Sequence, residues 1–464
     1  MQQASGEKHR DVQIAYIGGG SRGWAWGLMS DLAMEPNLSG VVRLYDLQYD
    51  AAAQNAVIGN RLAERDDAPG KWRYEAARTL PEALKGADFV IISILPGSFE
   101  LMASDVHLPE EYGIYQSVGD TVGPGGLLRA LRTIPQYVEI AGAIKAHAPE
   151  AWVINYTNPM TLCTRTLYEV FPGIKAIGCC HEVFGTQHLL AQMVERKLGI
   201  AKVDRREIKV NVLGINHFTW LDQASYEGID LFPLYKEFVD EFYEEGFEGS
   251  RKGHWLNDHF ASAQRVKFDL FRRYGVIAAA GDRHLAEFMP GDQYLRDPEA
   301  VRDWKFSLTK VDWRILNQQK LHADGDRLAA GEESFTLKPT GEEGIDMIKS
   351  LLGMGELITN VNLTNRGQST DLPAGAVVET NAVFAFDSVR PVVAGRLPDA
   401  VHEMVLRHVT NQETTLQAAL KQDKSLALEA FLNDPLVTIP RDRAEQLFDR
   451  MLQNTKSMLP GWRL

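Results

Sequence analysis

Three glycines near the start of the chain have the spacing of a dinucleotide-binding turn. Gly18, Gly20 and Gly23 form a G-x-G-x-x-G pattern directly after the apolar run 14–17. Glycines at these positions let a pyrophosphate lie against backbone amides at the start of a helix. A second apolar run ends in Asp46, where such a unit presents a carboxylate to the adenosine ribose. Because this carboxylate would repel the extra phosphate of NADP, the sequence predicts NAD rather than NADP. The alternative is a strand–turn–helix without a ligand, and the combination of the glycine turn with Asp46 argues against it.

Four further motifs carry side chains suited to chemistry: Asn158 before a proline, Cys180-His181, Asn216-His217, and Asp282. Successive side chains in extended backbone point to opposite faces, so one metal ion is not expected to bind both Cys180 and His181. His217 follows another apolar run and could supply the second ligand of an open Cys/His site. Each residue taken singly has a plainer alternative: Cys180 as a buried thiol, the histidines as hydrogen-bonded loop residues, and Asp282 as a turn carboxylate.

These motifs must be positioned by strands that alternate with helices. From residue 11 to about 178 the alternation is typical of a Rossmann-type doubly wound parallel sheet. The expected strands are Val12–Ile17, Val41–Tyr45, Phe89–Ile94, Trp152–Tyr156 and Ala176–Gly178, and the expected helices include Trp24–Met34 and Leu127–Ala148. Ligands bind at the ends of such strands. We therefore expect Ser21 and Ser93 at the cofactor and a ligand at the loop that carries Asn158.

The length of 464 residues predicts two domains. We expect an α/β fold with an NAD-binding domain at residues 1–185 and an α+β substrate and catalytic domain at residues 186–464. The second domain begins with a strand-like run at 208–214 and ends with helices from about residue 400. No Pro-, Ser- or Gly-rich linker separates them, which favours domains in close contact.

The composition indicates a small-molecule protein. With 49 basic and 62 acidic residues, the net charge of -13 argues against nucleic acid as a partner. The first ten residues lack an apolar stretch, so we expect neither a signal peptide nor a membrane span. Three cysteines cannot build a disulfide framework and suit a reducing compartment. These features predict a cytoplasmic protein.

The motifs occur in one order along most of the chain. They are 18–21, the glycine-rich stretch 119–135, 155–159, 178–181, 214–217, and 365–368 followed by Leu372-Pro373. This combination resembles glycoside hydrolase family 4, the NAD- and divalent-metal-dependent glycosidases. The family's architecture is similar to that of lactate and malate dehydrogenases.

The resemblance implies an unusual route to glycoside cleavage. NAD oxidises C3 of the sugar, a base removes the acidified C2 proton, the glycosidic bond breaks by elimination, water adds, and the hydride returns. A divalent cation, Mn²⁺ above all, stabilises the charge that develops at the C2 and C3 oxygens. No net oxidation takes place, and no pair of displacing carboxylates is needed.

The resemblance also assigns roles to residues. Cys180 and His217 match the metal ligands, and Asn158 matches an asparagine that binds a sugar hydroxyl. His181 stands where the leaving-group acid is expected, since an imidazole can donate a proton at neutral pH. The base is Asp282, with Tyr274 as the alternative.

The resemblance also bears on which sugar is cleaved. The stretch 278–287 is most similar to the α-galacturonidase members of the family. Arg283 and His284 in this stretch are predicted to contact the substrate, together with Arg132, and a guanidinium could hold a uronate carboxylate with two hydrogen bonds. A solvent-facing Arg-His pair is the plain alternative. The resemblance leaves α-glucosidase and α-galactosidase open as other activities.

Two rival functions share the predicted fold. A lactate or malate dehydrogenase-like oxidoreductase would not need Cys180, and a non-catalytic NAD sensor would not need the metal and base positions. The family resemblance further implies a homo-oligomer, a dimer or tetramer, and a sugar as the small-molecule partner.

Overall fold

A nine-stranded sheet forms the centre of the computed structural model, which describes residues 10–249 and 261–463. Its strand order is β13-β12-β11-β6-β5-β4-β1-β2-β3. The strands are β1 (Arg10–Ile17), β2 (Leu38–Tyr45), β3 (Lys71–Ala77), β4 (Phe89–Ile92), β5 (Trp152–Asn155), β6 (Lys175–Gly178), β11 (Leu357–Thr364), β12 (Val377–Ala385) and β13 (Ser388–Pro391). The parallel order 3-2-1-4-5-6 is that of a doubly wound dinucleotide-binding sheet, which confirms the predicted fold class.

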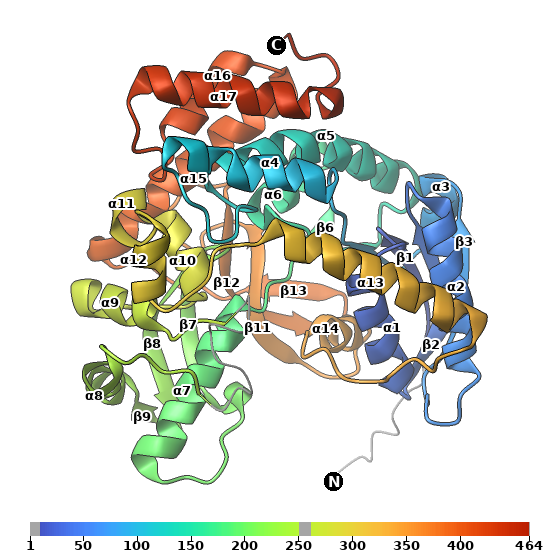
Figure 1. Cartoon of the computed structure of the whole chain (residues 1–464). Coiled ribbons are helices and arrows are strands. Elements are labelled where there is room, and N and C mark those ends of the chain that lie inside the picture. The colour runs from blue at the N-terminus through green and yellow to red at the C-terminus, as the bar shows by residue number, and fades with distance from the viewer. Residues whose placement is uncertain (1–9, 250–260, 464) are drawn as a thin grey trace.

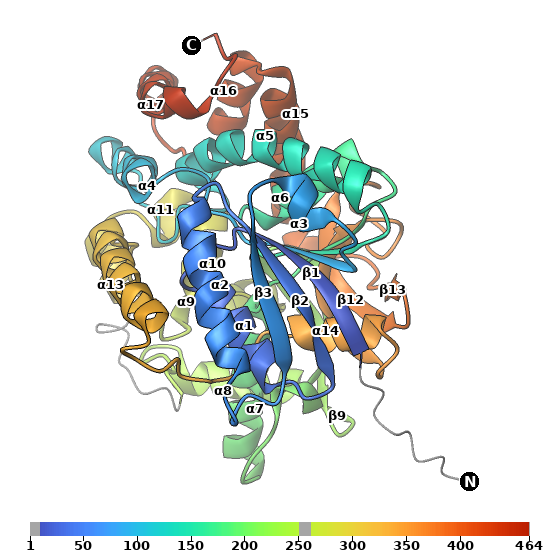
Figure 2. The same ribbon diagram turned by 90° about the vertical axis from the view of Figure 1, so that its right-hand side faces the viewer.

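Helices cover both faces of the parallel strands (Figure 1 and Figure 2). Those of the first half are α1 (Trp24–Met34), α2 (Tyr49–Ala63), α3 (Leu80–Leu84), α4 (Phe99–His107), α5 (Gly123–His147), α6 (Met160–Val170) and α7 (Glu182–Leu198). Alternate residues of β1 supply the two cores: Ile14 and Tyr16 pack with α1 and α2, whereas Ala15 and Ile17 pack with α3, α5 and α6. Burial on both faces explains why these strands are continuous apolar runs.

The second half of the chain builds a smaller sheet and most of the remaining helices. The order β10-β8-β7 joins β7 (Lys209–Ile215), β8 (Phe218–Tyr226) and β10 (Ile277–Ala278), with β9 (Ile229–Asp230) paired to β8. The helices are α8 (Phe232–Phe242), α9 (Arg265–Tyr274), α10 (Asp282–Phe288), α11 (Gly291–Tyr294), α12 (Pro298–Asp303), α13 (Val311–Ala330), α14 (Gly344–Leu351), α15 (Asp399–Lys421), α16 (Lys424–Leu432) and α17 (Arg441–Thr455).

The two halves of the chain are interlocked. Strands β11, β12 and β13 come from the second half, yet they extend the first sheet in antiparallel fashion beyond β6. Helix α13 runs across the front of the molecule and contacts both α2 and α4 (Figure 1). The division between residues 185 and 186 stays a prediction, because strands from both sides of it share one sheet.

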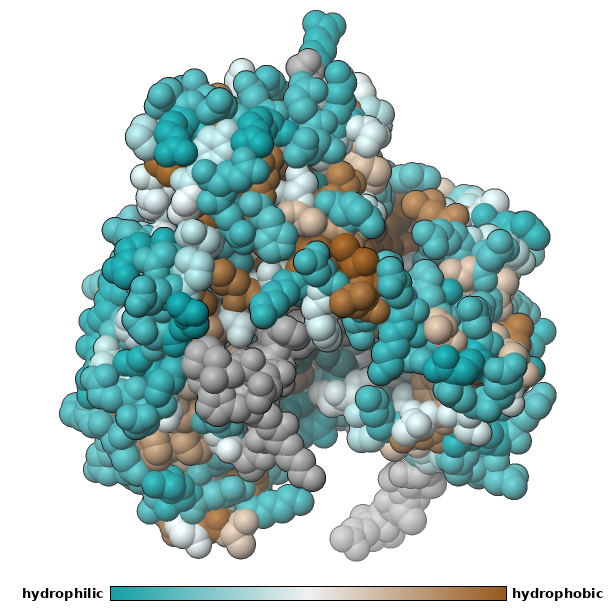
Figure 3. Space-filling view, viewed as in Figure 1, coloured by the Kyte–Doolittle hydropathy of each residue, from teal (hydrophilic) through white to brown (hydrophobic). Residues whose placement is uncertain are grey.

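The face shown in Figure 3 is covered mainly by hydrophilic side chains and is hollowed between the side that carries α7 and α8 and the side that carries α1 and α2. Within residues 10–249 and 261–463, no helix combines the length and apolar character that crossing a bilayer requires.

Candidate active site

The glycine turn between β1 and α1 has the shape of a phosphate cradle. Gly18 has a φ of 94°, and a Cβ atom built there would lie 1.9 Å from the carbonyl oxygen of Ser93. Only glycine fits this close approach of two loops. At Gly20, a Cβ atom would lie 2.9 Å from Oδ2 of Asp46. The turn thus keeps its backbone bare on the side that faces the ends of β2 and β4.

The other predicted cofactor residues lie around the same turn. The Gly20 amide donates to Oδ2 of Asp46 at 3.0 Å, which fixes this carboxylate at the end of β2. The hydroxyl of Ser21 accepts from the amides of Gly23 and Trp24, the latter at 3.1 Å, where α1 begins. The bare glycine turn at the start of α1 and the oriented carboxylate fit the pyrophosphate and ribose of NAD.

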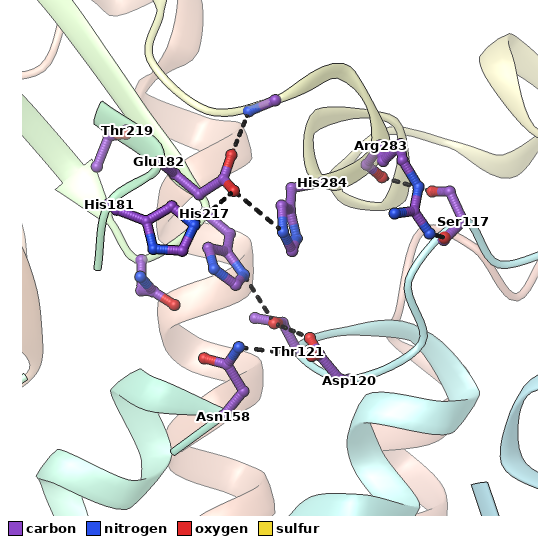
Figure 4. Close-up of polar contacts among 12 residues, drawn as sticks. Ser117, Asp120, Thr121, Asn158, His181, Glu182, His217, Thr219, Arg283 and His284 are labelled. Atoms are coloured by element: carbon purple, nitrogen blue, oxygen red, sulfur yellow. Dashed lines mark hydrogen bonds and ion pairs between the residues drawn. The ribbon is translucent and has the colours of Figure 1, made fainter. Parts of the chain in front are cut away.

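A second polar cluster lies across the ends of the strands, where three potential metal ligands converge (Figure 4). Donor atoms of Asp120, His217 and His284 all lie within 4.8 Å of one another. The His217 and His284 rings have centroids 3.6 Å apart. Two further side chains join them: the Thr121 hydroxyl lies 2.8 Å from Nδ1 of His217, and Nδ2 of Asn158 donates to Asp120 at 3.4 Å.

Backbone geometry sets the position of His217. Asn216 and His217 alone connect β7 to β8, and Ile215 pairs with Phe218 across this two-residue turn. His217 has a φ of 66°, a left-handed conformation that is uncommon outside glycine. Such residues persist where the surrounding structure holds them, and they concentrate at functional sites. The turn aims the imidazole at the loop that carries Asp120.

Burial and charge set the protonation states in this cluster. Burial lowers the pKa of His217 to about 3, so its imidazole is neutral at neutral pH and has a lone pair to share. Burial alone would raise the pKa of Asp120, but the Arg129 guanidinium and the neighbouring imidazoles hold it below its ordinary value. An ionised carboxylate and two imidazoles form a ligand set that suits divalent transition-metal ions such as Mn²⁺.

Cys180 and His181 occupy different environments after β6. Cys180 is buried, and burial together with Glu379 and Glu182 raises the pKa of its thiol. Within the part of the chain that the structure describes, the metal-capable group is Asp120, His217 and His284, so Cys180 stands outside it. The His181 side chain is 52% exposed, and its Nδ1 lies 2.8 Å from a carboxylate oxygen of Glu342. An exposed imidazole held by a carboxylate is suited to proton donation.

A pocket of about 260 Å³ opens between α1 and α14. Trp24 and Tyr156 line it, with ring centroids 5.2 Å apart. Glu342 lines it as well. Because Glu342 also contacts His181, the pocket connects the start of α1 to the predicted acid.

The two predicted bases both have hydrogen-bond partners within the protein. Both carboxylate oxygens of Asp282 accept backbone amides at the start of α9, from Val266 at 3.2 Å and from Lys267 at 3.1 Å. Asp282 is fully buried, which raises its pKa to about 6. Tyr274 ends the same helix, about 12 Å further along the axis, and its hydroxyl accepts from Arg273. This geometry favours a structural role for both side chains.

Two predicted substrate contacts have protein partners instead. Arg132 is buried and forms an ion pair with Asp105, and it also donates to Thr455 at 3.0 Å. Arg283 donates to the carbonyl oxygens of Ser307 and Ser117 and to the Thr309 hydroxyl. These bonds tie both guanidinium groups into the fold, whereas His284 faces the cluster (Figure 4).

Three residues of the cluster escaped the sequence analysis. Asp120 and Thr121 lie at the start of the glycine-rich stretch 119–135, which contributed to the family resemblance, but no site role was assigned to either residue. Glu182 follows His181 directly; its carboxylate accepts the Gly281 amide at 2.6 Å and lies 3.6 Å from Nε2 of His284. Glu182 thereby connects the loop after β6 to α10.

The fold and this cluster define a dinucleotide-type enzyme with a metal-capable site. Residues 13–196 match the family model described as Family 4 glycosyl hydrolase, and residues 212–437 match that of the Family 4 glycosyl hydrolase C-terminal domain. The chain therefore belongs to glycosyl hydrolase family 4.

Similar proteins agree with this assignment. The alpha-galacturonidase of Thermoanaerobacterium saccharolyticum is 63% identical over 464 residues, covering 100% of both chains. The crystal structure of lplD from Bacillus subtilis has a TM-score of 0.91 at 56% identity and covers 95% of this chain and 100% of that one. A 6-phospho-alpha-glucosidase from gut microorganisms, solved with NAD and Mn²⁺, has a TM-score of 0.79 at 19% identity over 98% of this chain and 100% of that chain, which shows the shared fold.

Proposed function

We propose that this glycosidase is an α-galacturonidase that depends on NAD and a divalent metal, with Mn²⁺ as the expected ion. The observation that carries the proposal is that one molecule has both features. The first is the bare glycine turn with Asp46, and the second is the Asp120–His217–His284 cluster. The high identity to the Thermoanaerobacterium alpha-galacturonidase supports the choice of sugar. A dehydrogenase of similar fold would not require the second cluster.

The chain's own residues divide the work between the glycine turn and the metal-capable cluster. The glycine turn and Asp46 would hold NAD, and the cluster would hold the metal, with Cys180 as a further predicted ligand. When bound, NAD supplies a hydride acceptor for C3 of the sugar, and the metal supplies positive charge beside the C2 and C3 oxygens. Asn158 lies at the same cluster, where its amide is placed to bind a sugar hydroxyl.

Proton transfer needs an acid and a base. His181 is our proposed acid: it is half exposed, and Glu342 orients its ring. Asp282 remains the base predicted from sequence, with Tyr274 as its alternative, although the hydrogen bonds of both favour structural roles. A base must approach the C2 proton to within about 3 Å, which makes the two residues separable by experiment.

The proposal also concerns the cellular location, the oligomeric state and the partners of the protein. We infer a cytoplasmic homo-oligomer, dimeric or tetrameric, with neither nucleic acid nor membrane as a partner. Exposed apolar side chains around the β13 edge of the sheet, Ile358, Phe386 and Val393, are 66%, 71% and 70% exposed and offer contact area for another subunit.

The test compares nitrophenyl α-galacturonide, α-glucoside and α-galactoside under reducing conditions, with and without NAD and Mn²⁺. Cleavage of the galacturonide only with both cofactors is the expected result. Cleavage of another sugar under the same dependence would correct the substrate and keep the mechanism. Hydrolysis that ignores NAD would remove the redox mechanism. A Cys180→Ser variant, assayed for Mn²⁺ affinity by calorimetry, separately tests the predicted ligand.

A further inference from the structure

Hydrogen bonds fix which nitrogen of His217 carries the lone pair. The Thr121 hydroxyl donates to Oδ1 of Asp120 at 2.7 Å, so its only hydrogen is used in this bond. Nδ1 of His217 lies 2.8 Å from the same hydroxyl oxygen and must therefore donate to it. A neutral imidazole has one ring N–H group. The lone pair of His217 is consequently on Nε2.

The second histidine of the cluster, His284, has a buried nitrogen without a partner. Nδ1 of His284 is shielded from solvent, and no residue in the described parts of the chain forms a hydrogen bond with it. Buried polar atoms without partners are rare in proteins, and an ion is one of the explanations for them. A hydrogen on Nδ1 would be a buried donor with no acceptor, whereas a lone pair on Nδ1 could bind a cation.

Glu182 faces the other nitrogen of the same ring (Figure 4). Oε1 of Glu182 lies 3.6 Å from Nε2 of His284. This distance is longer than an ordinary hydrogen bond, but the charge of the carboxylate still acts on the ring at this range. The carboxylate attracts a hydrogen on Nε2 and would repel a lone pair there. Glu182 therefore favours the proton on Nε2 and leaves the lone pair on Nδ1, the nitrogen without a partner.

The backbone holds the Glu182 carboxylate in this position. Oε2 of Glu182 accepts the Gly281 amide at 2.6 Å, and Gly281 directly precedes α10, the helix that carries His284. Because one oxygen is bound at the start of this helix, the other stays directed at a ring on the same helix. An amide in place of the carboxylate could not serve both contacts. Its NH₂ group would face either the Gly281 N–H or the N–H of the ring, and both of these are donors.

From these contacts we infer that Glu182 is a positioning residue, which fixes the tautomer and orientation of His284 so that Nδ1 is the atom that binds the divalent metal. The inference rests on the proposed function and deepens it. A carboxylate behind a ligating imidazole fixes the ring and raises the basicity of the ligating nitrogen. Glu182 thus acts on the metal through His284 rather than as a ligand itself.

The test measures Mn²⁺ binding by the whole chain without sugar, under reducing conditions, from the electron paramagnetic resonance signal of the free ion. Glu182→Gln should raise the dissociation constant for Mn²⁺ by about 10- to 100-fold, because the ring loses its carboxylate. His284→Ala should raise the constant at least as much. Since Glu182 acts through His284, the variant with both changes should bind Mn²⁺ within about threefold of His284→Ala alone. A merely structural role of Glu182 would instead give losses that add.

The matched control is Glu110→Gln, because Glu110 contacts Nδ1 of His107 at 2.9 Å outside the cluster and its loss should leave Mn²⁺ binding unchanged. Additive losses, or Mn²⁺ binding by Glu182→Gln within about threefold of wild type, would overturn the inference.

A measurement on the metal-free wild type decides the question even where Glu182→Gln does not fold. Nitrogen NMR of ring-labelled histidine should show the proton of His284 on Nε2, and a proton on Nδ1 would overturn the inference. The His284→Ala spectrum assigns the signal. A wild type that binds no Mn²⁺ would remove the metal from the proposed function itself, which is a distinct result.

Discussion

Variants of Asp282 can distinguish a structural role of this residue from a chemical one. Its carboxylate is fully buried and accepts two backbone amides at the start of α9, from Val266 and Lys267. Hydrogen bonds to a charged acceptor contribute about 1.5 kcal/mol each or more. We therefore expect Asp282→Ala to lower the free energy of unfolding by about 3 kcal/mol. Asp282→Asn keeps one oxygen acceptor and should lose about half as much.

Calorimetry measures the structural role of Asp282 through the Tm, and isotope exchange measures its chemical role. With an unfolding entropy of roughly 2.1 cal/mol/K per residue, a loss of 3 kcal/mol corresponds to a fall in Tm of about 3 °C for a chain of this length. Exchange of the substrate's C2 proton with deuterium from solvent should continue in Asp282→Asn within about tenfold of wild type. A general base contributes about 10²- to 10⁴-fold to the reaction rate, so loss of the true base would slow the exchange by more than this limit.

Loss of that exchange in Asp282→Asn, with an unchanged Tm, would refute the structural interpretation and identify Asp282 as the base. Tyr274→Phe is the companion variant, because it removes only the hydroxyl that accepts from Arg273. Exchange that survives in both variants would exclude both residues predicted from sequence.

Three further perturbations test other parts of the structure. Gly18→Ala should weaken NAD binding by at least about tenfold in a fluorescence titration, because its Cβ would collide with the carbonyl oxygen of Ser93; unchanged affinity would contradict the cradle. Arg132→Met should cost about 3–5 kcal/mol in urea unfolding because it strands the buried Asp105 carboxylate, and a loss below about 1 kcal/mol would show that the pair is not needed. Burial raises the pKa of Asp434 from 3.8 to about 6. The folded state therefore binds this proton more tightly, and the resulting stability is complete below about pH 4 and lost, by about 3 kcal/mol, as the pH rises to 6. Asp434→Asn lacks this titration, so the stability difference from wild type should change by that amount between pH 4 and 7; a constant difference would argue against the raised pKa.

The sequence predicted the parts of the fold whose signal is local. Strands buried on both faces are apolar runs, so β1, β2, β4, β5 and β6 were expected within a few residues of their observed ends. The edge strand β3 was not among the expected strands, although its partial alternation of buried and exposed residues is the pattern of a half-buried strand. The antiparallel addition of β11, β12 and β13 was missed for another reason, since pairing between segments about 180 residues apart leaves no local pattern.

The sequence indicated candidate residues where a polar side chain follows an apolar run, but it could not indicate the direction in which each side chain points. Cys180, His181 and His217 were chosen as candidates because each follows an apolar run. The consecutive residues Asp282, Arg283 and His284 begin α10, where each residue turns about 100° from the last. They consequently point to α9, to Ser117 and to His217 in turn. Sequence alone showed three chemical side chains together, but only the fold shows which one faces the cluster.

The same helix also explains how the cluster is held rigid. Glu287 lies one turn after His284 on α10, and one oxygen of its buried carboxylate accepts the amides of Val118 at 2.7 Å and Gly119 at 2.8 Å. The next residue is Asp120, so α10 carries one member of the cluster and also fixes the loop that presents another. The third member, His217, is tied to the same loop through Thr121. A site held by such supporting contacts keeps its geometry before any ligand binds. The cluster combines residues from both halves of the chain, so its geometry depends on the packing between them.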